Sequence, residues 1–533
     1  MKVLLIKPFN YFHEDDFVLS SAEPLGLIYL ATYINDKHDV EIFDATIGNN
    51  FKRGNVERNG EYIRYGVSPK EISRKIIDFK PDLVGVVAQF FTQSLAIKEV
   101  IEIIKNTLPE TTLVAGGNCV SCMRELFLEN HPSVDILVCG EGEITFKELC
   151  DSEVKNLKKI KGIIYRDKNN KIITNEARPL ISDLNKMLYP DRSRVHSRFY
   201  HLQNAPFFSE IKVELHKIKF GNILMRLLGR NIITIPRNKL LARILSFGVV
   251  FKVYAEVAYF LTNYSYHPIS ADIETSRGCP FSCVFCAVKN TWTRKFRSRS
   301  IEHIRSELIY LIKNKKIKHV NITDDAFNID KNRLYELCDV FVELKIKSWR
   351  PMSGLYIMLL NREILSRMYE TGCKHISLII ESGCQDTLDN IIRKNVNITY
   401  AREIAEICKE IGFTTYASFV IGFPGETKEN ILETVKYAAS LELDSCNFWL
   451  ATPYPGTDLY EICLEGNYLP ENFDIKNLHK TYHTNFSIPI ISTEYFTIEE
   501  IGKLREVANE MICQKGRWED WKDKLYRGLN YNS

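Results

Sequence analysis

The loop at residues 276–286 carries the side chains with the clearest capacity for chemistry. Its three cysteines have the spacing C-x3-C-x2-C: Cys279, Cys283 and Cys286. Thiolates are the ligands that iron–sulfur clusters select. A four-iron cluster held by three cysteines keeps one iron open to bind and polarise a small molecule. The alternative, three buried cysteines without a cofactor, is disfavoured by this spacing, by Gly278 in the turn and by the aromatic Phe285 before the last cysteine.

Alternating strands and helices surround this loop. A strand is predicted directly before the cysteines, at 269–275, and a helix is predicted to begin after Ser300. Four further strands are predicted along the chain: 318–323, 372–380, 414–421 and 446–451. The pattern indicates about six strand–helix units between residues 269 and 465, forming a partial, open (β/α)6 barrel.

Polar residues and glycines follow these strands. The ones that we expect at the ligand-binding end are Asp324, Asp325, Glu381, Ser382, Gly422 and Pro424. The carboxyl ends of parallel strands share one face of a barrel, so a common ligand can reach all of them. Glycine there allows a ligand to approach the backbone closely. Helix capping is the alternative role for the two aspartates.

Residues 1–150 show a second run of strands and helices. Strands are predicted at 2–7, 39–45, 83–88, 112–115 and 135–139. Their alternation with helices, including one at 120–129, predicts a doubly wound, Rossmann-like parallel sheet, in which ligands bind beyond the carboxyl ends of the strands. Gly116, Gly117 and Asn118 follow one strand, and Glu141 and Gly142 follow another. No phosphate-binding glycine motif occurs at the first turn, so a nucleotide is not the indicated ligand.

Two segments separate these units. Residues 151–199 are predicted to form a β-hairpin around Asn169-Asn170 and a linker. Residues 200–268 form a basic, apolar insert, with nine Lys or Arg against three Glu between positions 210 and 262. Helices packed on the enzyme and a membrane-surface segment are both open readings of this insert. A spanning helix is disfavoured by the two charges Lys252 and Glu256.

Composition sets the remaining limits. The 533 residues carry a net charge of +3, which gives no global footprint for nucleic acid. Fourteen cysteines without a regular framework are expected to be free thiols in a reducing cytoplasm, and the start of the sequence lacks the features of a signal peptide. Residues 466–533 are predicted to form a small C-terminal helical domain with a helix opening at Thr497, which packs over the barrel or contacts substrate through its aromatic residues.

The cysteine loop resembles the C-x3-C-x-aromatic-C signature of the radical SAM superfamily. The resemblance implies a [4Fe-4S] cluster on Cys279, Cys283 and Cys286, with S-adenosylmethionine chelating the fourth iron and releasing a 5'-deoxyadenosyl radical on reduction. It also implies that residues at the strand ends contact S-adenosylmethionine: Phe285, Asp324, Asp325, Glu381, Ser382, Gly422 and Pro424.

The first domain resembles the cobalamin-binding domain that precedes many radical SAM cores, in its segments KPFN, EPLGLIYLATYI, VAGGN and CGEGEITFKEL. The resemblance implies cobalamin contacts at Gly116, Gly117, Asn118, Glu141 and Gly142. The D-x-H-x-x-G signature is absent, and Asn118 stands where this group often has histidine. We therefore expect cobalamin without a histidine ligand from that motif. A scaffold that has lost or never had the cofactor is the alternative. His13 and His38 are expected in surface or loop positions rather than on cobalt.

These resemblances imply a cobalamin-dependent radical SAM enzyme that abstracts hydrogen from an unactivated carbon, with C-methylation as the leading reaction. The alternative is ring formation or oxidation of a lipid or porphyrin-like substrate without methyl transfer, and the remote one is a non-catalytic iron–sulfur or cobalamin sensor. A methylthiotransferase is disfavoured because the first domain lacks three cluster-spaced cysteines of its own. The expected partners are a small-molecule or lipid substrate and a reducing donor such as flavodoxin or ferredoxin, with no nucleic acid and with membrane contact left open.

Overall fold

The computed structural model describes residues 1–13, 22–47, 56–59, 62–195, 270–471, 473, 489–514, 516 and 518–528. The insert predicted at 200–268, with its membrane-surface alternative, lies outside the described residues. Within the described ranges, no helix combines the length and the apolar character that crossing a membrane requires.

The N-terminal domain is built on a seven-stranded sheet, sheet A, in the order β10-β9-β8-β7-β6-β1-β3. Its strands are β1 (Lys2–Lys7), β3 (Asp39–Asp44), β6 (Leu83–Val87), β7 (Thr112–Gly116), β8 (Ile136–Val138), β9 (Ile163–Arg166) and β10 (Ile172–Thr174). The strands from β3 to β8 are parallel, and the predicted hairpin, β9 and β10, continues the sheet antiparallel. The chain order reverses between β1 and β6, the switch point at which such sheets bind ligands. The predicted doubly wound, Rossmann-like sheet is confirmed.

Helices cover both faces of sheet A, as a parallel sheet requires. Val3 and Leu5 pack in a core with residues of α1 (Leu25–Ile34) and α6 (Gly142–Asp151). Leu4 and Ile6 face the opposite core. The helices on that side are α2 (Pro69–Phe79) and α3 (Ser94–Thr107).

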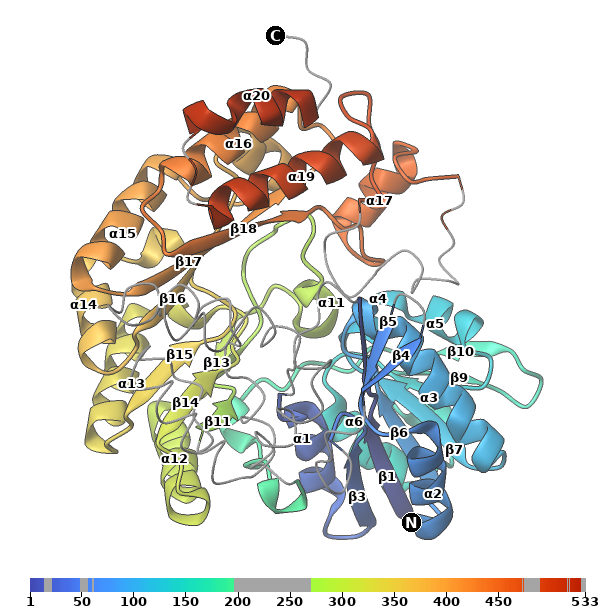
Figure 1. Ribbon diagram of the computed structural model, residues 1–533. Coiled ribbons are helices and arrows are strands. Elements are labelled where there is room, and N and C mark those ends of the chain that lie inside the picture. The colour runs from blue at the N-terminus through green and yellow to red at the C-terminus, as the bar shows by residue number, and fades with distance from the viewer. Residues whose placement is uncertain are drawn as a thin grey trace.

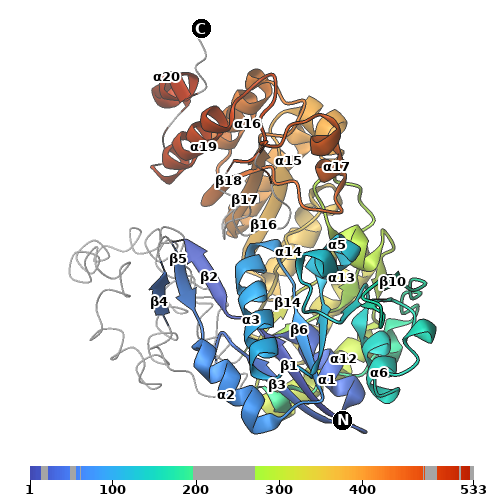
Figure 2. The ribbon, with the colours of Figure 1, turned by 90° about the vertical axis from the view of Figure 1, so that its right-hand side faces the viewer.

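Two features of this domain differ from the sequence prediction. The helix predicted at 120–129 is two short helices, α4 (Asn118–Met123) and α5 (Glu125–Asn130), because Arg124 has φ of +51° and breaks the helical turn. A small antiparallel sheet was not predicted; its strands are β2 (Asn10–His13), β4 (Val56–Asn59) and β5 (Tyr62–Tyr65). Figure 2 shows this sheet beside α3.

The second domain contains two parallel three-stranded sheets, β11-β14-β15 and β16-β17-β18. Their strands are β11 (Ser270–Ile273), β14 (His319–Ile322), β15 (Ser348–Pro351), β16 (His375–Glu381), β17 (Thr414–Ile421) and β18 (Ser445–Leu450). A parallel bridge between Leu355 and Leu378 connects the two sheets, so the six strands follow one another as an open barrel wall. Figure 1 shows this wall beside sheet A.

The sequence indicated five of the barrel strands by position but not β15. Its four residues, Ser-Trp-Arg-Pro, have no clear alternation and end in a proline. The helices outside the wall include α12 (Ile301–Lys315), α13 (Lys331–Glu343), α14 (Arg362–Glu370), α15 (Ile398–Ile411) and α16 (Lys428–Ser440). Ser300 caps α12 as predicted, accepting a hydrogen bond from the His303 N–H.

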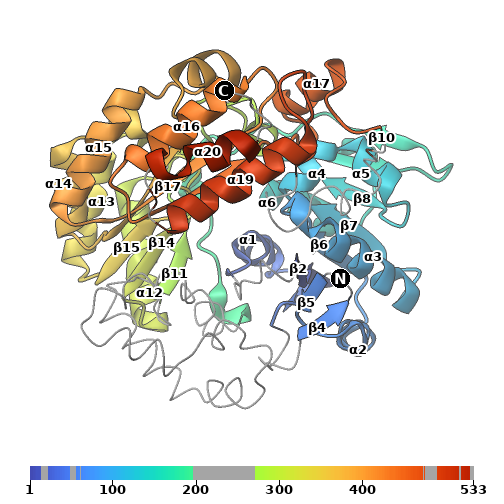
Figure 3. The same cartoon turned by 45° about the horizontal axis from the view of Figure 1, so that its top comes forward.

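The C-terminal helices pack at the β18 end of the barrel wall. Helix α19 (Ile498–Cys513) packs against β18, and α20 (Trp518–Gly528) packs on α19 and α16. Figure 3 shows both helices lying across this end of the molecule. Thr497 and Glu500 form a capping box at the predicted start of α19. The described C-terminal part thus contains two helices, and the predicted helix start at Thr497 is confirmed.

Candidate active site

The cysteine loop lies between β12 (Ser276–Arg277) and α11 (Val288–Trp292). All three of its cysteines are half-buried and none is in a disulfide. Burial raises the pKa of Cys283 and of Cys286 to about 11, so these thiols hold their protons at neutral pH until a metal displaces them.

The loop supplies the donor set of an iron–sulfur cluster, three soft thiolates at the spacing C-x3-C-x2-C. In a four-iron cluster each thiolate binds a different iron, so the sulfurs stand farther apart than around one ion. Gly278 has φ of +86°, and a Cβ there would lie 2.4 Å from the Lys295 carbonyl oxygen, so the turn before Cys279 needs glycine.

The two aspartates after β14 have different surroundings. Asp324 is buried and accepts hydrogen bonds from the Thr275 N–H (2.6 Å) and the Ser276 hydroxyl (2.6 Å). Its carboxylate therefore fixes the start of the cysteine loop. Asp325 is half-buried, and burial raises the pKa of its carboxyl to about 6, an effect that the nearby Gly278 N–H partly offsets. Neither aspartate caps α13, whose cap is Asp330.

The segment after β16 is stabilised by polar contacts. Glu381 has φ of +74° and forms a nearly buried ion pair with Lys394 (3.0 Å). The charge of Lys394 also partly offsets the rise in the pKa of the Cys283 thiol. The Ser382 hydroxyl is hydrogen-bonded to that of Thr434 (2.8 Å) and accepts from the Cys384 N–H. Lys394 was missed by the sequence analysis, since no motif marks a lysine beyond a short helix.

The loop after β17 is held by the buried carboxyl group of Glu426. Glu426 accepts hydrogen bonds from the N–H groups of Gly422 (2.7 Å) and Phe423 (2.8 Å). Burial raises its pKa to about 8. Pro424 is half-buried in this loop, and Phe285 of the cysteine loop lies 5.9 Å from the ring of Phe423. The structure thus brings the predicted strand-end residues and the cysteine loop to one side of the barrel, where their contacts with S-adenosylmethionine stay a prediction.

The carboxyl edge of sheet A holds the residues predicted for cobalamin. Gly117 has φ of +115°, and a Cβ there would lie 2.6 Å from the Ala88 carbonyl oxygen, so β6 and β7 approach closely at this edge. Gly116 ends β7 and Gly142 begins α6. Glycines at the carboxyl ends of parallel strands let a ligand approach the backbone closely. The contacts of these glycines with the cofactor stay a prediction.

Asn118 and Glu141 direct their side chains to the barrel domain instead. The Asn118 Oδ1 accepts a hydrogen bond from the Thr291 hydroxyl (2.9 Å). The Glu141 carboxylate pairs with Arg277 (2.9 Å) and Arg297 (2.9 Å). These contacts were not foreseen, because the partners lie far away in sequence.

Of the two histidines considered from sequence, His38 lies away from the loops after β6 to β8. His38 precedes β3, at the opposite end of the sheet from the glycines, and its ring is 3.1 Å from Asp151. His13 is the last residue of β2 rather than a loop residue.

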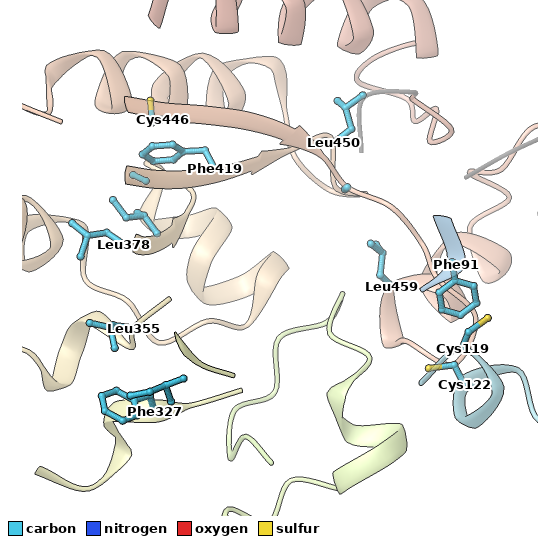
Figure 4. Packing of buried hydrophobic residues seen from close by; sticks show 14 of the residues in the cluster. Phe91, Cys119, Cys122, Phe327, Leu355, Leu378, Phe419, Cys446, Leu450 and Leu459 are labelled. Carbon is cyan, nitrogen blue, oxygen red and sulfur yellow. The ribbon is translucent and has the colours of Figure 1, made fainter. Parts of the chain in front are cut away.

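The two domains meet where both carboxyl edges face each other. Helix α11, directly after the last cysteine of the loop, packs against α4 of the first domain. Phe91 stacks on Tyr454 at 4.7 Å. Figure 4 shows Phe91 together with Cys119 and Cys122 of α4, near Leu459 of the barrel domain. The predicted cluster site and the predicted cobalamin site are therefore neighbours.

Comparison with protein families gives two matches. Residues 273–438 match the radical SAM superfamily, and residues 18–150 match the B12 binding domain. An uncharacterized methyltransferase of Pyrococcus horikoshii is 29% identical over 516 residues, which is 95% of this chain and 91% of that protein. The cytidylyl-2-hydroxyethylphosphonate methyltransferase of Streptomyces wedmorensis is 24% identical, over 88% of this chain and 82% of its own length.

A third relative has another activity in its name. The anaerobic magnesium-protoporphyrin IX monomethyl ester cyclase of Rubrivivax gelatinosus is 24% identical, over 86% of this chain and 70% of that protein. Among solved structures, the radical S-adenosylmethionine methyltransferase TsrM from Kitasatospora setae, with cobalamin and a [4Fe-4S] cluster bound, has a TM-score of 0.59 at 17% identity, over 88% of this chain and 75% of that chain. At this identity the likeness concerns the fold alone.

Proposed function

The chain belongs to the B12-binding radical SAM enzyme family, and on that premise we propose that it is a C-methyltransferase acting on an unactivated carbon of a small-molecule substrate. Its cofactors are a [4Fe-4S] cluster, S-adenosylmethionine and cobalamin. When bound, they supply a 5'-deoxyadenosyl radical for hydrogen abstraction and a methyl group for transfer.

The proposal rests on one contact: the cysteine loop, where the cluster is predicted, lies against the carboxyl edge of sheet A, where cobalamin is predicted. Asn290 and Thr291, which follow the last cysteine closely, hydrogen-bond to Cys122 (3.3 Å) and Asn118 (2.9 Å) at the edge of sheet A. A substrate between these edges is within reach of both cofactor sites. Methyl transfer needs this proximity because hydrogen abstraction and methyl delivery occur at one substrate carbon. The Pyrococcus relative, a methyltransferase by name along nearly the whole chain, supports the same proposal.

The protein's residues have distinct parts in this proposal. The three thiolates hold the cluster, and Asp324 fixes the strand end from which the cysteine loop starts. The Glu426 carboxyl group keeps the turn after β17 in one conformation, since it accepts hydrogen bonds from two adjacent backbone N–H groups of that turn. Fixed loops hold the reactants in a geometry close to that of the reaction and exclude water, which would quench a radical.

The inner wall of the barrel offers a place for the substrate. On β17 and β18 the buried side chains, such as Phe419 and Phe448, alternate with half-buried or exposed ones. Phe419 contacts Tyr437 of the outer helix α16, so Tyr416 and Trp449 lie on the opposite, inner face. The Trp449 indole N–H lies 3.3 Å from the Tyr416 hydroxyl. We propose that this pair orients a polar part of the substrate.

Ring formation or oxidation without methyl transfer is the second candidate, and the Rubrivivax cyclase is the observation that favours it. The sensor reading is set aside, because the chain is a radical SAM enzyme. Such an enzyme needs a substrate and a reductant; a flavodoxin or ferredoxin as donor remains a proposal. We further propose a cytoplasmic location, since all fourteen cysteines are free thiols.

Product analysis of the anaerobically reconstituted, full-length protein tests the function. The enzyme receives S-adenosylmethionine carrying a deuterated methyl group, hydroxocobalamin and a strong reductant, with a small-molecule extract as the source of substrate. Methyl transfer predicts 5'-deoxyadenosine together with S-adenosylhomocysteine and a labelled product. Formation of 5'-deoxyadenosine without S-adenosylhomocysteine would rule out methyl transfer and favour the cyclase-like reaction.

A further inference from the structure

The start of the cysteine loop is held by the cobalamin domain. Arg277, two residues before Cys279, has a guanidinium group that is 2% exposed. Its Nη1 pairs with Glu141 (2.9 Å) and its Nη2 with Glu143 (2.6 Å), both at the start of α6. Its Nε pairs with Glu274 of its own domain (2.7 Å). One buried cation therefore joins the loop to the two glutamates of the other domain.

A second arginine supports the same contact. Arg297 pairs with Arg277 across the short ladder of β12 and β13 (Arg297–Ser298). Its Nη1 donates to Glu141 (2.9 Å) and to the Ile181 carbonyl oxygen (2.6 Å), while the Ile181 N–H donates to the other Glu141 oxygen (2.6 Å). Both carboxylate oxygens of Glu141 thus accept hydrogen bonds from residues outside sheet A. A buried carboxylate with this many donors is fixed in place.

The end of the loop is held as well. The Thr291 hydroxyl donates to the Asn118 Oδ1 (2.9 Å), and the Asn290 amide donates to the Cys122 sulfur (3.3 Å) and the Gly456 carbonyl oxygen (2.9 Å). A Cβ at Gly456 would lie 2.9 Å from the Cys122 carbonyl oxygen, so the chains are in close contact here. Both ends of the cysteine loop thus rest on the edge of sheet A.

We propose that Glu141 and Asn118 are positioning residues that clamp the cysteine loop to the carboxyl edge of sheet A, so that cluster assembly and cobalamin binding favour each other. The cluster orders the cysteine loop on one side of this contact, and cobalamin orders the carboxyl edge of sheet A on the other side. Ordering either side in advance removes part of the cost of ordering the other. By linkage, the effect is the same in both directions. This inference does not depend on methyl transfer.

The experiment compares cobalamin binding with and without the cluster. Full-length protein is titrated anaerobically with hydroxocobalamin and followed by absorbance, once with the cluster reconstituted and once in a cluster-free background in which Cys279, Cys283 and Cys286 are all changed to Ala. The quantity of interest is the ratio of the two dissociation constants. We expect cobalamin to bind about fivefold more tightly, or better, when the cluster is present.

Two substitutions address the two ends of the loop. Glu141→Gln weakens the pairing with Arg277 and Arg297, and Thr291→Val removes a single hydroxyl donor with little change in shape. Each is placed in both backgrounds, and each is expected to move the ratio toward one. If Glu141→Gln fails to fold, Thr291→Val alone still tests the clamp.

The matched control is Glu23→Gln. Glu23 forms an equally buried ion pair with Arg192 (2.9 Å), which also contacts Glu307 of α12 (3.2 Å); both of these partners lie outside the cysteine loop. This variant is expected to keep the ratio of the unmodified protein. The proposal is overturned by a ratio near one in the unmodified protein, by a ratio that neither loop variant lowers, or by an equal loss in Glu23→Gln. None of these outcomes depends on which product the enzyme makes.

Discussion

The cysteine loop of the barrel and the carboxyl edge of sheet A are the two predicted cofactor sites. They differ in the contacts that their predicted residues make. In the cysteine loop, Cys279, Cys283 and Cys286 are free thiols, as a cluster site requires. At the edge of sheet A, the side chains of Asn118 and Glu141 are bonded to the barrel domain. A ligand motif specifies its own donor atoms, whereas a glycine-rich turn specifies a backbone path and leaves its polar neighbours open to other roles.

The largest effect is expected where the donor atoms are removed. Cys283→Ala should reduce the iron and sulfide content to background and abolish formation of 5'-deoxyadenosine, because two thiolates do not retain the cluster. The control is Cys446→Ala, which shortens a buried core thiol of β18 and should keep the iron content. Metal analysis and the absorbance of the reconstituted protein measure both. Full iron occupancy in Cys283→Ala would contradict the cluster assignment.

The next largest effect is expected in stability, at the contact between the edges. Arg277→Met leaves the carboxylates of Glu141, Glu143 and Glu274 in a buried site without their shared cation. Breaking a buried ion pair from one side typically costs about 3–5 kcal/mol. The midpoint of urea unfolding of the full-length protein should fall accordingly.

Arg305→Met is the control for this substitution. Arg305 pairs with Glu343 on the surface, and exposed ion pairs contribute little to stability. Its urea midpoint should stay close to that of the unmodified protein. Equal midpoints in Arg277→Met and Arg305→Met would mean that the contact between the domains does not depend on the buried charges.

Periodicity in the sequence was sufficient to predict sheet A and five of the six strands of the barrel wall. Apolar runs or alternation in the sequence predict strands such as β1 and β17. Ser300 and Thr497 predict helix starts, because their side chains can cap a helix. The contacts of Glu141 could not be predicted in this way. Its partner Arg277 lies 136 positions away, and only the packing of the two domains brings the two charges together.

The same limit explains the two aspartates. The position of Asp324 and Asp325 after a strand was predictable, but which of them is turned toward Thr275 and which toward Gly278 depends on backbone geometry that two adjacent, identical residues do not reveal. Lys394 is another such case. It acquires its role only by approaching Glu381 in the folded protein.

The loop after β17 should make the free energy of unfolding depend on pH. Burial raises the pKa of Glu426 from 4.5 to about 8. Between these values the folded protein binds the proton and the unfolded chain does not, so this group lowers the free energy of unfolding as pH rises through that window. At roughly 1.4 kcal/mol per pKa unit, the change amounts to a few kcal/mol.

Glu426→Gln should remove this dependence, because the amide does not titrate. Urea unfolding of both proteins between pH 5 and about pH 9 measures it. We expect the advantage of the unmodified protein over the variant to shrink toward high pH. A constant difference between the two proteins would show that Glu426 titrates normally, and the account of its burial would fail.

The smallest effect is expected at the glycine turn of sheet A. Gly117 combines φ of +115° with an approach that would bring a Cβ within 2.6 Å of the Ala88 carbonyl oxygen. Gly117→Ala should therefore cost about 1–3 kcal/mol in local strain and reduce the cobalamin content more than the iron content. Gly26→Ala is the matched control, since no atom lies within 4 Å of its added methyl and its backbone lies in α1. If Gly117→Ala instead lost iron and kept cobalamin, this edge would serve the cluster loop alone, and the distinction between the two edges would have to be abandoned.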